Sequence, residues 1–216
     1  RSRIVSHERT TVRVDLGPRS YDIEIGSGLL SSLGVFVASR STVHHAVIIA
    51  DENVASFASQ VEQSLLAVSA RTTLLSVPPG EESKSIAMAE RLWNELLEAR
   101  TDRKSLVIAV GGGVIGDLAG FVAATFARGL PFFQVPTTLL AHVDSSVGGK
   151  VAVNLPAAKN MVGVFWQPSG VLIDVDTLRT LPEREYRAGL AEVVKYGVIL
   201  DEHFFGKLER HWEAIL

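Results

Sequence analysis

Residues with chemically useful side chains are concentrated between Ser105 and Lys195 of this 216-residue chain. The stretch contains a glycine-rich turn, a Pro-Thr-Thr turn, an aspartate and a lysine on either side of a Gly-Gly pair, and a glutamate three residues before another lysine. Glycines let a backbone approach an anion closely, and lysines bind carboxylates and phosphates through charge-assisted hydrogen bonds. This concentration in one part of the chain predicts a ligand site.

The glycine-rich turn follows an apolar strand. Ser105 to Val110 lead into Gly111 to Asp117, which match the pattern G-x-G-x-x-G, and a helix follows. Free N–H groups and the dipole at a helix start favour a phosphate there. The acid expected about twenty residues later in a dinucleotide fold is absent, and Gln134 to Pro136 stand in its place. A tight strand-to-helix turn without a ligand therefore remains an alternative to a dinucleotide site.

Two further polar segments follow the glycine turn. Thr137 and Thr138 end the next apolar strand with two hydroxyls, and Asp144 and Lys150 flank a flexible Gly-Gly pair. The second segment is not a P-loop, because G-x-x-x-x-G-K-[ST] requires a glycine at 144 and a hydroxyl at 151, where Asp144 and Val151 stand.

Glu192 and Lys195 lie on a helix whose apolar face includes Leu190, Val193 and Val194. Their spacing of three puts them on one face of this helix, offset from the apolar one. From spacing alone, a solvated ion pair is the simplest interpretation.

Composition excludes several classes of protein. With 47% hydrophobic and 21% charged residues, the chain is typical of a globular protein, and a net charge of −3 gives no broad basic field for nucleic acid. The absence of cysteine rules out disulfides and cysteine zinc sites. No apolar run is long enough to span a membrane, and the polar opening from residue 1 to 10 lacks the core of a signal peptide. We expect a cytoplasmic location.

The pattern of apolar runs predicts the fold. Residues 11–16 and 21–25 alternate and flank a Gly-Pro turn, which predicts two half-buried antiparallel strands. After them, apolar runs alternate with helical segments; the runs are 46–50, 72–77, 106–110, 132–135 and 171–174, and the helices are 53–69, 84–99 and 114–127. This alternation predicts an α/β fold with a Rossmann-like, mostly parallel sheet covered by helices on both faces.

Polar residues collect at the ends of the predicted parallel strands, at 51–53, 80–84, 111–117 and 137–138. Because parallel strands end at the same edge of a sheet, one rim should hold all these residues. Ligands bind outside the carboxyl ends of such strands, so the rim is the expected ligand site. After Asp174 no strand pattern recurs, and Thr180 to Glu183 predict a capping box with Pro182 in the first helical turn. We therefore expect an α/β domain over 1–178 and the beginning of an all-α C-terminal domain over 179–216.

At these residues the chain resembles the 3-dehydroquinate synthase family. The resemblance is close over 103–201 and looser before residue 78, and the family's chains extend well beyond Leu216. The segments that carry it are Gly111–Asp117, Phe121–Ala124, Arg128-Gly129, Pro136–Leu140, Asp144–Lys150, Lys159–Gly163, Thr180–Pro182 and Gly189–Gly197.

The resemblance implies NAD as a cofactor. Gly112, Gly113 and Val114 would offer backbone N–H groups to the pyrophosphate, and Asp51 would hold a ribose diol. Locally, Asp51 is also typical of a turn acid, and Glu81 and Lys84 of a capping acid and an exposed lysine. The cofactor-binding residues implied are Asp51, Asn53, Glu81, Lys84, Gly112, Gly113, Val114, Ile115, Gly116, Asp117, Thr137, Thr138, Lys150, Lys159, Thr177, Leu178, Arg179 and Thr180.

The resemblance also implies a divalent metal, Zn²⁺ or Co²⁺, with Glu192 as its first ligand. The family's two histidine ligands lie beyond Leu216, and one carboxylate does not hold zinc tightly. His203 and His211 lie outside the family's histidine motifs, so we interpret them as surface or core residues of a last helix. The histidines at 44, 45 and 142 are likewise interpreted as structural.

For the substrate, the resemblance implies catalytic roles for Asp144, Lys150, Asn160, Lys195 and Arg128. Lys159 and Asn160 follow a predicted loop at 156–158. Arg128 would reach the substrate phosphate across a homodimer interface, although a cation at a helix C-terminus before a glycine also fits ordinary capping.

The implied activity is that of a carbon–oxygen lyase of the shikimate pathway, which converts 3-deoxy-D-arabino-heptulosonate 7-phosphate to 3-dehydroquinate and phosphate. NAD would oxidise the C5 hydroxyl, zinc would polarise that oxygen, phosphate would leave, C5 would be reduced again, and an aldol step would close the ring. The alternatives are another sugar phosphate cyclase, a metal-dependent polyol dehydrogenase, or an NAD-binding module without activity. We expect a sugar phosphate as partner, and neither nucleic acid nor membrane.

Overall fold

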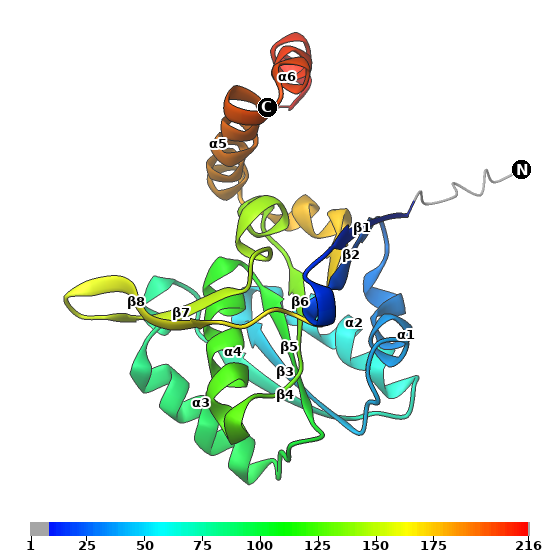
Figure 1. Ribbon diagram of the computed structural model, residues 1–216, viewed down its shortest axis with the longest axis vertical. Helices are drawn as coiled ribbons and strands as arrows, with labels where there is room; N and C mark the ends of the chain where they lie inside the picture. The colour runs from blue at the N-terminus through cyan, green and yellow to red at the C-terminus, as the bar shows by residue number, and fades with distance from the viewer. Residues whose placement is uncertain (1–8, 216) are drawn as a thin grey trace, which may run out of the picture.

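A seven-stranded sheet forms the centre of the protein (Figure 1). The structure is a computed structural model and describes residues 9–215. In spatial order the strands are β1 (Thr10–Val14), β2 (Tyr21–Gly26), β9 (Gly170–Asp174), β6 (Phe132–Pro136), β5 (Leu106–Gly111), β3 (His45–Asp51) and β4 (Arg71–Val77). β1 runs antiparallel to β2, and every other neighbouring pair is parallel. The predicted α/β fold with a mostly parallel sheet is therefore confirmed.

Helices cover both faces of this sheet, which explains why its central strands are apolar throughout. α1 (Leu33–Ala38) and α2 (Ala55–Leu66) lie on one face, and α3 (Ile86–Glu98) and α4 (Gly113–Thr125) lie on the other (Figure 1). On β3, Ile48 packs into the core under α1 and α2, whereas Val47 and Ile49 pack into the core under α3 and α4. This alternation is the period of two expected of a strand.

Short 3₁₀ turns precede two of the predicted helices, so these helices begin later than the sequence indicated. η3 (Glu52–Val54) leads into α2, and η4 (Glu81–Ser83) lies before α3. α3 begins after Ser85, whose side chain accepts a hydrogen bond from the backbone N–H of Met88. Another turn, η5 (Phe126–Arg128), ends the α4 region.

The sequence interpretation missed a β-hairpin formed by β7 (Lys150–Leu155) and β8 (Ala158–Phe165). The segment at 156–158 was expected to be a loop, and its first two residues are in fact the turn between the two strands. β7 packs on α4, where a Cβ added at Gly120 would lie 2.3 Å from Cγ1 of Val151. Only glycine at this position allows the hairpin to lie so close to the helix.

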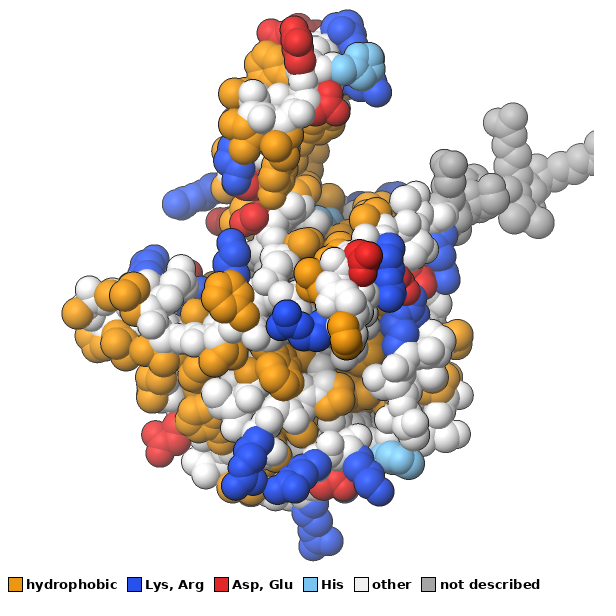
Figure 2. Space-filling model, viewed as in Figure 1, with side chains coloured by type: hydrophobic (Ala, Val, Ile, Leu, Met, Phe, Trp, Pro, Cys, Tyr) orange, Lys and Arg blue, Asp and Glu red, His pale blue; other side chains and the backbone are white. Residues whose placement is uncertain are grey.

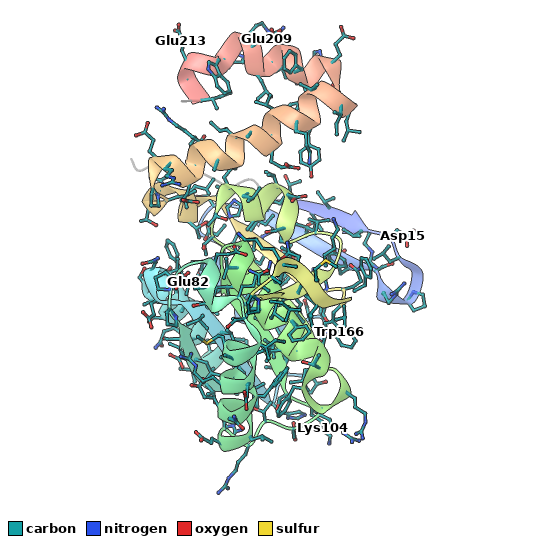
Figure 3. The ribbon with its side chains drawn as sticks, turned by 90° about the vertical axis from the view of Figure 1, so that its left-hand side faces the viewer. Asp15, Glu82, Lys104, Trp166, Glu209 and Glu213 are labelled. Carbon is teal, nitrogen blue, oxygen red and sulfur yellow. The ribbon has the colours of Figure 1, made fainter. Side chains whose placement is uncertain are left out.

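Two helices, α5 (Glu183–Leu200) and α6 (Glu202–Ile215), project from the sheet (Figures 1 and 3). They pack on each other, and α5 also contacts the π-helical turn η6 (Ala141–Ser145). Apolar side chains remain exposed near the end of α5, at Val198, Ile199 and Leu200, and Figure 2 shows hydrophobic side chains along these helices. The division of the chain at residue 178 stays a prediction.

The capping box predicted before α5 is not formed. Pro182 is itself the N-cap residue, and α5 starts at Glu183 without a side-chain cap. The Thr180 hydroxyl instead donates to the carbonyl of Thr177 at 3.3 Å, inside the 3₁₀ segment η7 (Val175–Thr180). The prediction was wrong because η7 already uses this threonine for its own last turn.

No helix within residues 9–215 is long and apolar enough to cross a membrane. The expectation about a signal peptide concerns residues 1–10, of which 1–8 lie outside the described part of the chain.

Buried histidines give the fold a predictable pH dependence. His45 is buried; its Nδ1 lies 2.8 Å from a guanidinium nitrogen of Arg71, and its Nε2 lies 2.9 Å from the hydroxyl of Thr73. Since Nδ1 must accept from Arg71, the ring is neutral with its proton on Nε2. Burial, and then the charge of Arg71, lower the pKa of His45. These contacts confirm its interpretation as a structural histidine.

We expect His45 to make the folded protein less stable in acid. Its pKa is about 6.5 in the unfolded chain and lower in the folded one, so the unfolded state binds the proton first as the pH falls below about 6.5. The free energy of unfolding should then fall by up to about 1.4 kcal/mol per pH unit for this group. Urea unfolding between pH 7 and pH 5 measures this slope.

The variant His45→Gln should lose part of the slope, whereas His44→Gln, a change at the exposed neighbour, should keep it. The slope should not vanish in His45→Gln, because burial also lowers the pKa of His142. Equal slopes in the two variants would contradict the assignment of the acid sensitivity to His45.

Candidate functional site

The carboxyl ends of the parallel strands meet at one edge of the sheet, as predicted. β3 ends at Asp51, β5 at Gly111, β6 at Pro136 and β9 at Asp174, and η4 follows β4. The chain reverses its direction of strand addition between β3 and β5, because β4 lies on one side of β3 and β5 on the other. In open α/β sheets, ligands bind outside the carboxyl ends of the strands at such a switch point.

The glycine turn lies beside this switch point and starts α4. Gly112 is the N-cap residue in an extended conformation, and Gly113 is the first residue of the helix. A Cβ added at Gly112 would lie 2.9 Å from Cγ2 of Thr138, and one at Gly113 would lie 3.0 Å from Oγ of Ser145. The turn is therefore pressed against two neighbouring segments. The first backbone N–H groups of α4 have no partner within the helix, which suits a diphosphate.

A buried lysine, Lys84, lies between the first turns of α4 and the hairpin. The Nζ of Lys84 contacts the carboxylate of Asp117 and the Oδ1 of Asn160, and the residue is only 5% exposed. The local interpretation of Lys84 as an exposed lysine was therefore wrong. Burial raises the pKa of Asp117, and the Lys84 ammonium offsets part of this rise.

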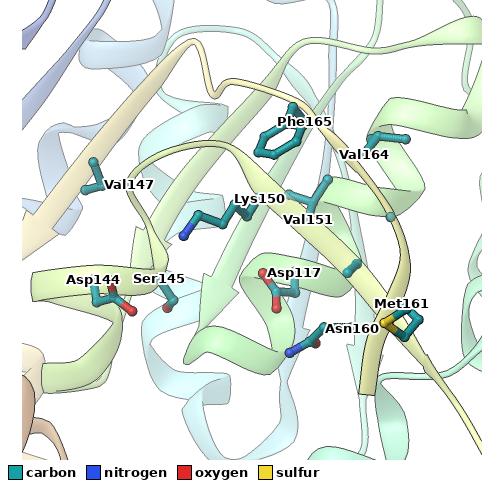
Figure 4. Close-up of a pocket in the computed structure, with 12 residues that line it drawn as sticks. Asp117, Asp144, Ser145, Val147, Lys150, Val151, Asn160, Met161, Val164 and Phe165 are labelled. Atoms are coloured by element: carbon teal, nitrogen blue, oxygen red, sulfur yellow. The ribbon is translucent and has the colours of Figure 1, made fainter. Parts of the chain in front are cut away.

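A cavity of about 500 Å³ brings together four of the predicted site residues (Figure 4). Asp117 comes from α4, Asp144 from η6, and Lys150 and Asn160 from the two strands of the hairpin. Other parts of the lining were not predicted: Ser145 and Val147 from η6 and the turn after it, and Met161 and Phe165 from the hairpin that was missed. The Val-x-Val alternation at 151–153 and at 162–164 is the signal from which these two strands could have been predicted.

A charged cluster lies where α5 packs on η6. Lys195 forms an ion pair with Glu192, as its spacing predicted, and the hydroxyl of Tyr196 donates to Oδ1 of Asp144 at 3.4 Å. The hydrogen bond to Glu192 raises the pKa of Lys195. Burial, followed by the charges of Asp144 and Glu192, raises the pKa of Tyr196. The lysine is thus held protonated beside two carboxylates.

The described residues do not form a metal centre by themselves. Within residues 9–215, no group of three or more His, Cys, Asp or Glu side chains is close enough together to hold an ion. Glu192 contributes one carboxylate and is engaged by Lys195. His203 and His211 are exposed on α6, and the buried His142 lies 2.9 Å from the carbonyl of Pro136, so these three fit the structural interpretation.

Several predicted site residues lie on the rim but outside the cavity. Oδ1 of Asp51 accepts from the backbone N–H of Asn53 at 2.8 Å, as a turn acid does. Lys159 and Glu81 face each other at 3.9 Å. Among the residues of η7, Thr177 is buried and its hydroxyl donates to the carbonyl of Asp174. The cofactor roles of all these residues remain predictions, as do those of Leu178, Arg179 and Thr180.

Arg128 lies at the opposite end of α4 from the glycine turn. It is exposed and follows the C-terminal end of α4, and a helix of 13 residues puts that end about 18 Å from Gly113. The helix-cap interpretation fits in part, because Arg128 and Gly129 both have positive φ angles of 71° and 115° at this chain reversal.

The fold and the rim define a Rossmann-like α/β domain with a helical extension. Residues 74–188 match the model of the family described as 3-dehydroquinate synthase N-terminal, and the chain belongs to the 3-dehydroquinate synthase family. A 3-dehydroquinate synthase from Desulforamulus reducens is 52% identical over 207 residues, which are 95% of this chain and 58% of the relative. One from Rhodopirellula baltica is 54% identical, covering 90% of this chain and 54% of the relative. The chain thus spans little more than half the length of these curated relatives.

Solved structures of related enzymes share the fold. A 2-deoxy-scyllo-inosose synthase complexed with carbaglucose-6-phosphate, NAD⁺ and Co²⁺ is 31% identical with a TM-score of 0.83, and the match covers 88% of this chain and 53% of that one. A 2-epi-5-epi-valiolone synthase from Streptomyces hygroscopicus with NAD⁺ and Zn²⁺ bound is 28% identical with a TM-score of 0.82, covering 96% and 57%.

Proposed function

We propose that this chain is part of a 3-dehydroquinate synthase, which converts 3-deoxy-D-arabino-heptulosonate 7-phosphate to 3-dehydroquinate and phosphate. The observation that carries the proposal is the convergence of Asp117, Asp144, Lys150 and Asn160 on one cavity at the start of α4, in a chain of this family. The cavity combines carboxylate, ammonium and amide groups, which suit a polyhydroxylated acidic substrate.

NAD is the cofactor we propose for the rim. The backbone amides of Gly112, Gly113 and Val114 would bind its diphosphate, because they lie at the start of a 13-residue helix. Side chains at 112 and 113 would press against Thr138 and Ser145. Asp51, at the end of β3 across the switch point, would hold a ribose diol. The chemistry supplied by NAD is reversible hydride transfer, so the overall reaction is redox-neutral.

The chain's own residues would bind and orient the substrate. Lys150 and Lys195 would neutralise anionic groups, and the pKa of Lys195 is raised so that it stays protonated. Asp144, which already accepts from Tyr196, would accept a further hydrogen bond from a substrate hydroxyl, and Asn160 would donate one through its amide.

The solved relatives contain Co²⁺ or Zn²⁺. We propose Glu192 as one metal ligand in the longer protein, with the remaining ligands supplied from outside the described residues. One carboxylate does not hold such an ion tightly, so the metal site would be complete only with those further ligands.

We also propose a homodimer in which Arg128 serves the site of the partner subunit. Arg128 is exposed, and the length of α4 separates it from the diphosphate site of its own chain, which supports this assignment. The cytoplasmic location remains a prediction.

The proposed reaction separates cleanly from its rivals by its products. With the heptulosonate phosphate, NAD and Zn²⁺, the full-length protein should release phosphate without net absorbance of NADH at 340 nm. A polyol dehydrogenase would accumulate NADH from an alcohol, and a different cyclase would release phosphate from a different sugar phosphate only. Either result would refute the assignment.

For the 216-residue chain itself we expect NAD binding without turnover, because the described residues supply one metal ligand. Calorimetric titration with NAD and a phosphate-release assay with added Zn²⁺ check the two halves of this expectation. Zinc-dependent phosphate release by the purified chain would contradict it.

A further inference from the structure

Asn154 lies at an irregularity in the hairpin. The register pairs Val153 with Val162 but Leu155 with Ala158, so Asn154 of β7 lies opposite three residues of β8, Lys159, Asn160 and Met161. Such bulges re-aim a side chain and are common next to functional sites. Here the extra residues are on β8 and include Asn160, and Asn154 opposite them contacts η4 and Lys84, the segment that follows β4 on the rim.

Three hydrogen bonds fix Asn154 between these segments. Its backbone N–H donates to the carbonyl of Lys84 at 2.8 Å, and its Nδ2 donates to Oε1 of Glu81 at 2.6 Å. Its Oδ1 accepts from the backbone N–H of Asn160 at 2.9 Å. A parallel bridge between Ser85 and Asn154 continues the contact. One side chain therefore joins the rim segment to the opposite strand of the hairpin.

The residue at the far end of this link has an unusual backbone. Asn160 has a φ of 59°, in the left-handed region that few residues other than glycine and asparagine adopt. Its backbone N–H is held by Asn154 and its Oδ1 by Lys84, so both halves of the residue are anchored. Asn160 lines the cavity, and its orientation there depends on these anchors.

Val162 packs against the core under α3 and α4, but other apolar residues of β8 are largely exposed. Met161 and Phe165 are 72% and 75% exposed, and β8 pairs only with β7 in its sheet. The contacts of Asn154, Lys159 and Asn160 with the 81–84 segment therefore hold the tip of the hairpin against the rim.

We propose that Asn154 is a positioning residue that couples the 81–84 segment to Asn160. Through this link, a nucleotide contacting the 81–84 segment also orders the part of the hairpin that lines the substrate cavity. The coupling deepens the proposed function and rests on it, whereas the positioning of Asn160 is a property of the ligand-free chain. Coupling between two ligands is reciprocal, so substrate in the cavity should in turn favour the nucleotide.

The first experiment needs no ligand. Asn154→Asp keeps the acceptor for Asn160 but removes the donor to Glu81 and opposes two carboxylates. Hydrogen exchange of the backbone amides of 158–163 should become about tenfold faster, the factor expected when a hydrogen bond worth about 1.4 kcal/mol is lost. Adding Glu81→Gln restores the hydrogen bond in the opposite direction, with the amide at position 81 as the donor and the carboxylate at position 154 as the acceptor. The double variant should therefore recover slow exchange.

Asn94→Asp provides the matched control, because it makes the same change at an exposed position of α3 and should leave the hairpin's exchange unchanged. Unchanged exchange in Asn154→Asp, or failure of the Glu81→Gln pair to restore it, would overturn the positioning role.

The second experiment adds NAD to the same chain. NAD should slow exchange at 158–163 in the unmodified chain, and this slowing should be lost in Asn154→Ala. Equal slowing in both would overturn the coupling and leave the proposed function intact. Absence of NAD binding to the unmodified chain would refute the proposed function together with the coupling, while the ligand-free exchange still decides whether Asn154 positions Asn160.

Discussion

Replacing Lys84 by methionine should destabilise the folded chain by about 3 kcal/mol, the cost of removing one member of a buried ion pair. The substitution keeps most of the side-chain volume but leaves the carboxylate of Asp117 without its ammonium. Because burial already raises the pKa of Asp117, removal of Lys84 should raise it further and favour the neutral acid. Urea unfolding at pH 7 measures the loss of stability.

The pair Lys84→Met and Asp117→Leu should be less destabilised than Lys84→Met alone, because no uncompensated charge remains in the double variant. The matched control is Lys207→Met on α6, where the lysine is exposed and the change should cost little. A loss of stability no greater in Lys84→Met than in this control would contradict the importance of the buried pair.

Replacing Gly112 by alanine should weaken NAD binding by about tenfold or more, which corresponds to at least about 1.4 kcal/mol. Its backbone conformation is one that alanine adopts readily, so the effect comes from the side chain alone. The new Cβ would lie 2.9 Å from Cγ2 of Thr138, and the turn must move away from β6 to accommodate it. The amides that would bind the diphosphate move with it. Calorimetric titration of the variant with NAD checks the expectation.

A second substitution distinguishes this steric cause from a general loss of folding. Thr138→Ser removes the methyl group that the new Cβ would meet but keeps the hydroxyl that accepts from the N–H of Ala141 at 3.2 Å. Combined with Gly112→Ala, it should recover most of the NAD affinity. An unchanged NAD affinity in Gly112→Ala, or a loss that Thr138→Ser does not reverse, would contradict the steric explanation. Gly206→Ala on α6 serves as the control for glycine replacement and should bind NAD normally.

The fold could be predicted because its strands carry strong local signals. β3 and β5 are buried on both faces, so their continuous apolar runs stand out from the helical periodicity around them. Parallel pairing then requires that their polar ends meet at one edge, and the rim follows from topology alone. The family could be predicted from motifs that coincide with this rim.

What the sequence concealed depends on contacts between distant segments. The hairpin was missed because β8 is mostly exposed and interrupted by Lys159, Asn160 and Gly163, so its alternation is weak. Lys84 was interpreted as exposed because its partners lie 33 and 76 residues away along the chain, where no local pattern reveals them. Asn154 had no sequence signal at all, since its partners Glu81 and Lys84 lie about seventy residues earlier in the chain.

Because β7 packs on α4 at Gly120, this one helix supports two parts of the site. The N-terminal end of α4 presents backbone amides to the rim, and the middle of α4 packs against β7. A sideways slide of α4 would thus carry the nucleotide end and the wall of the cavity together, preserving the spacing between them. A bulkier residue at 120 would instead push β7 away from α4 without moving the start of the helix. Gly120 therefore fixes the distance between the nucleotide end of the site and the cavity wall.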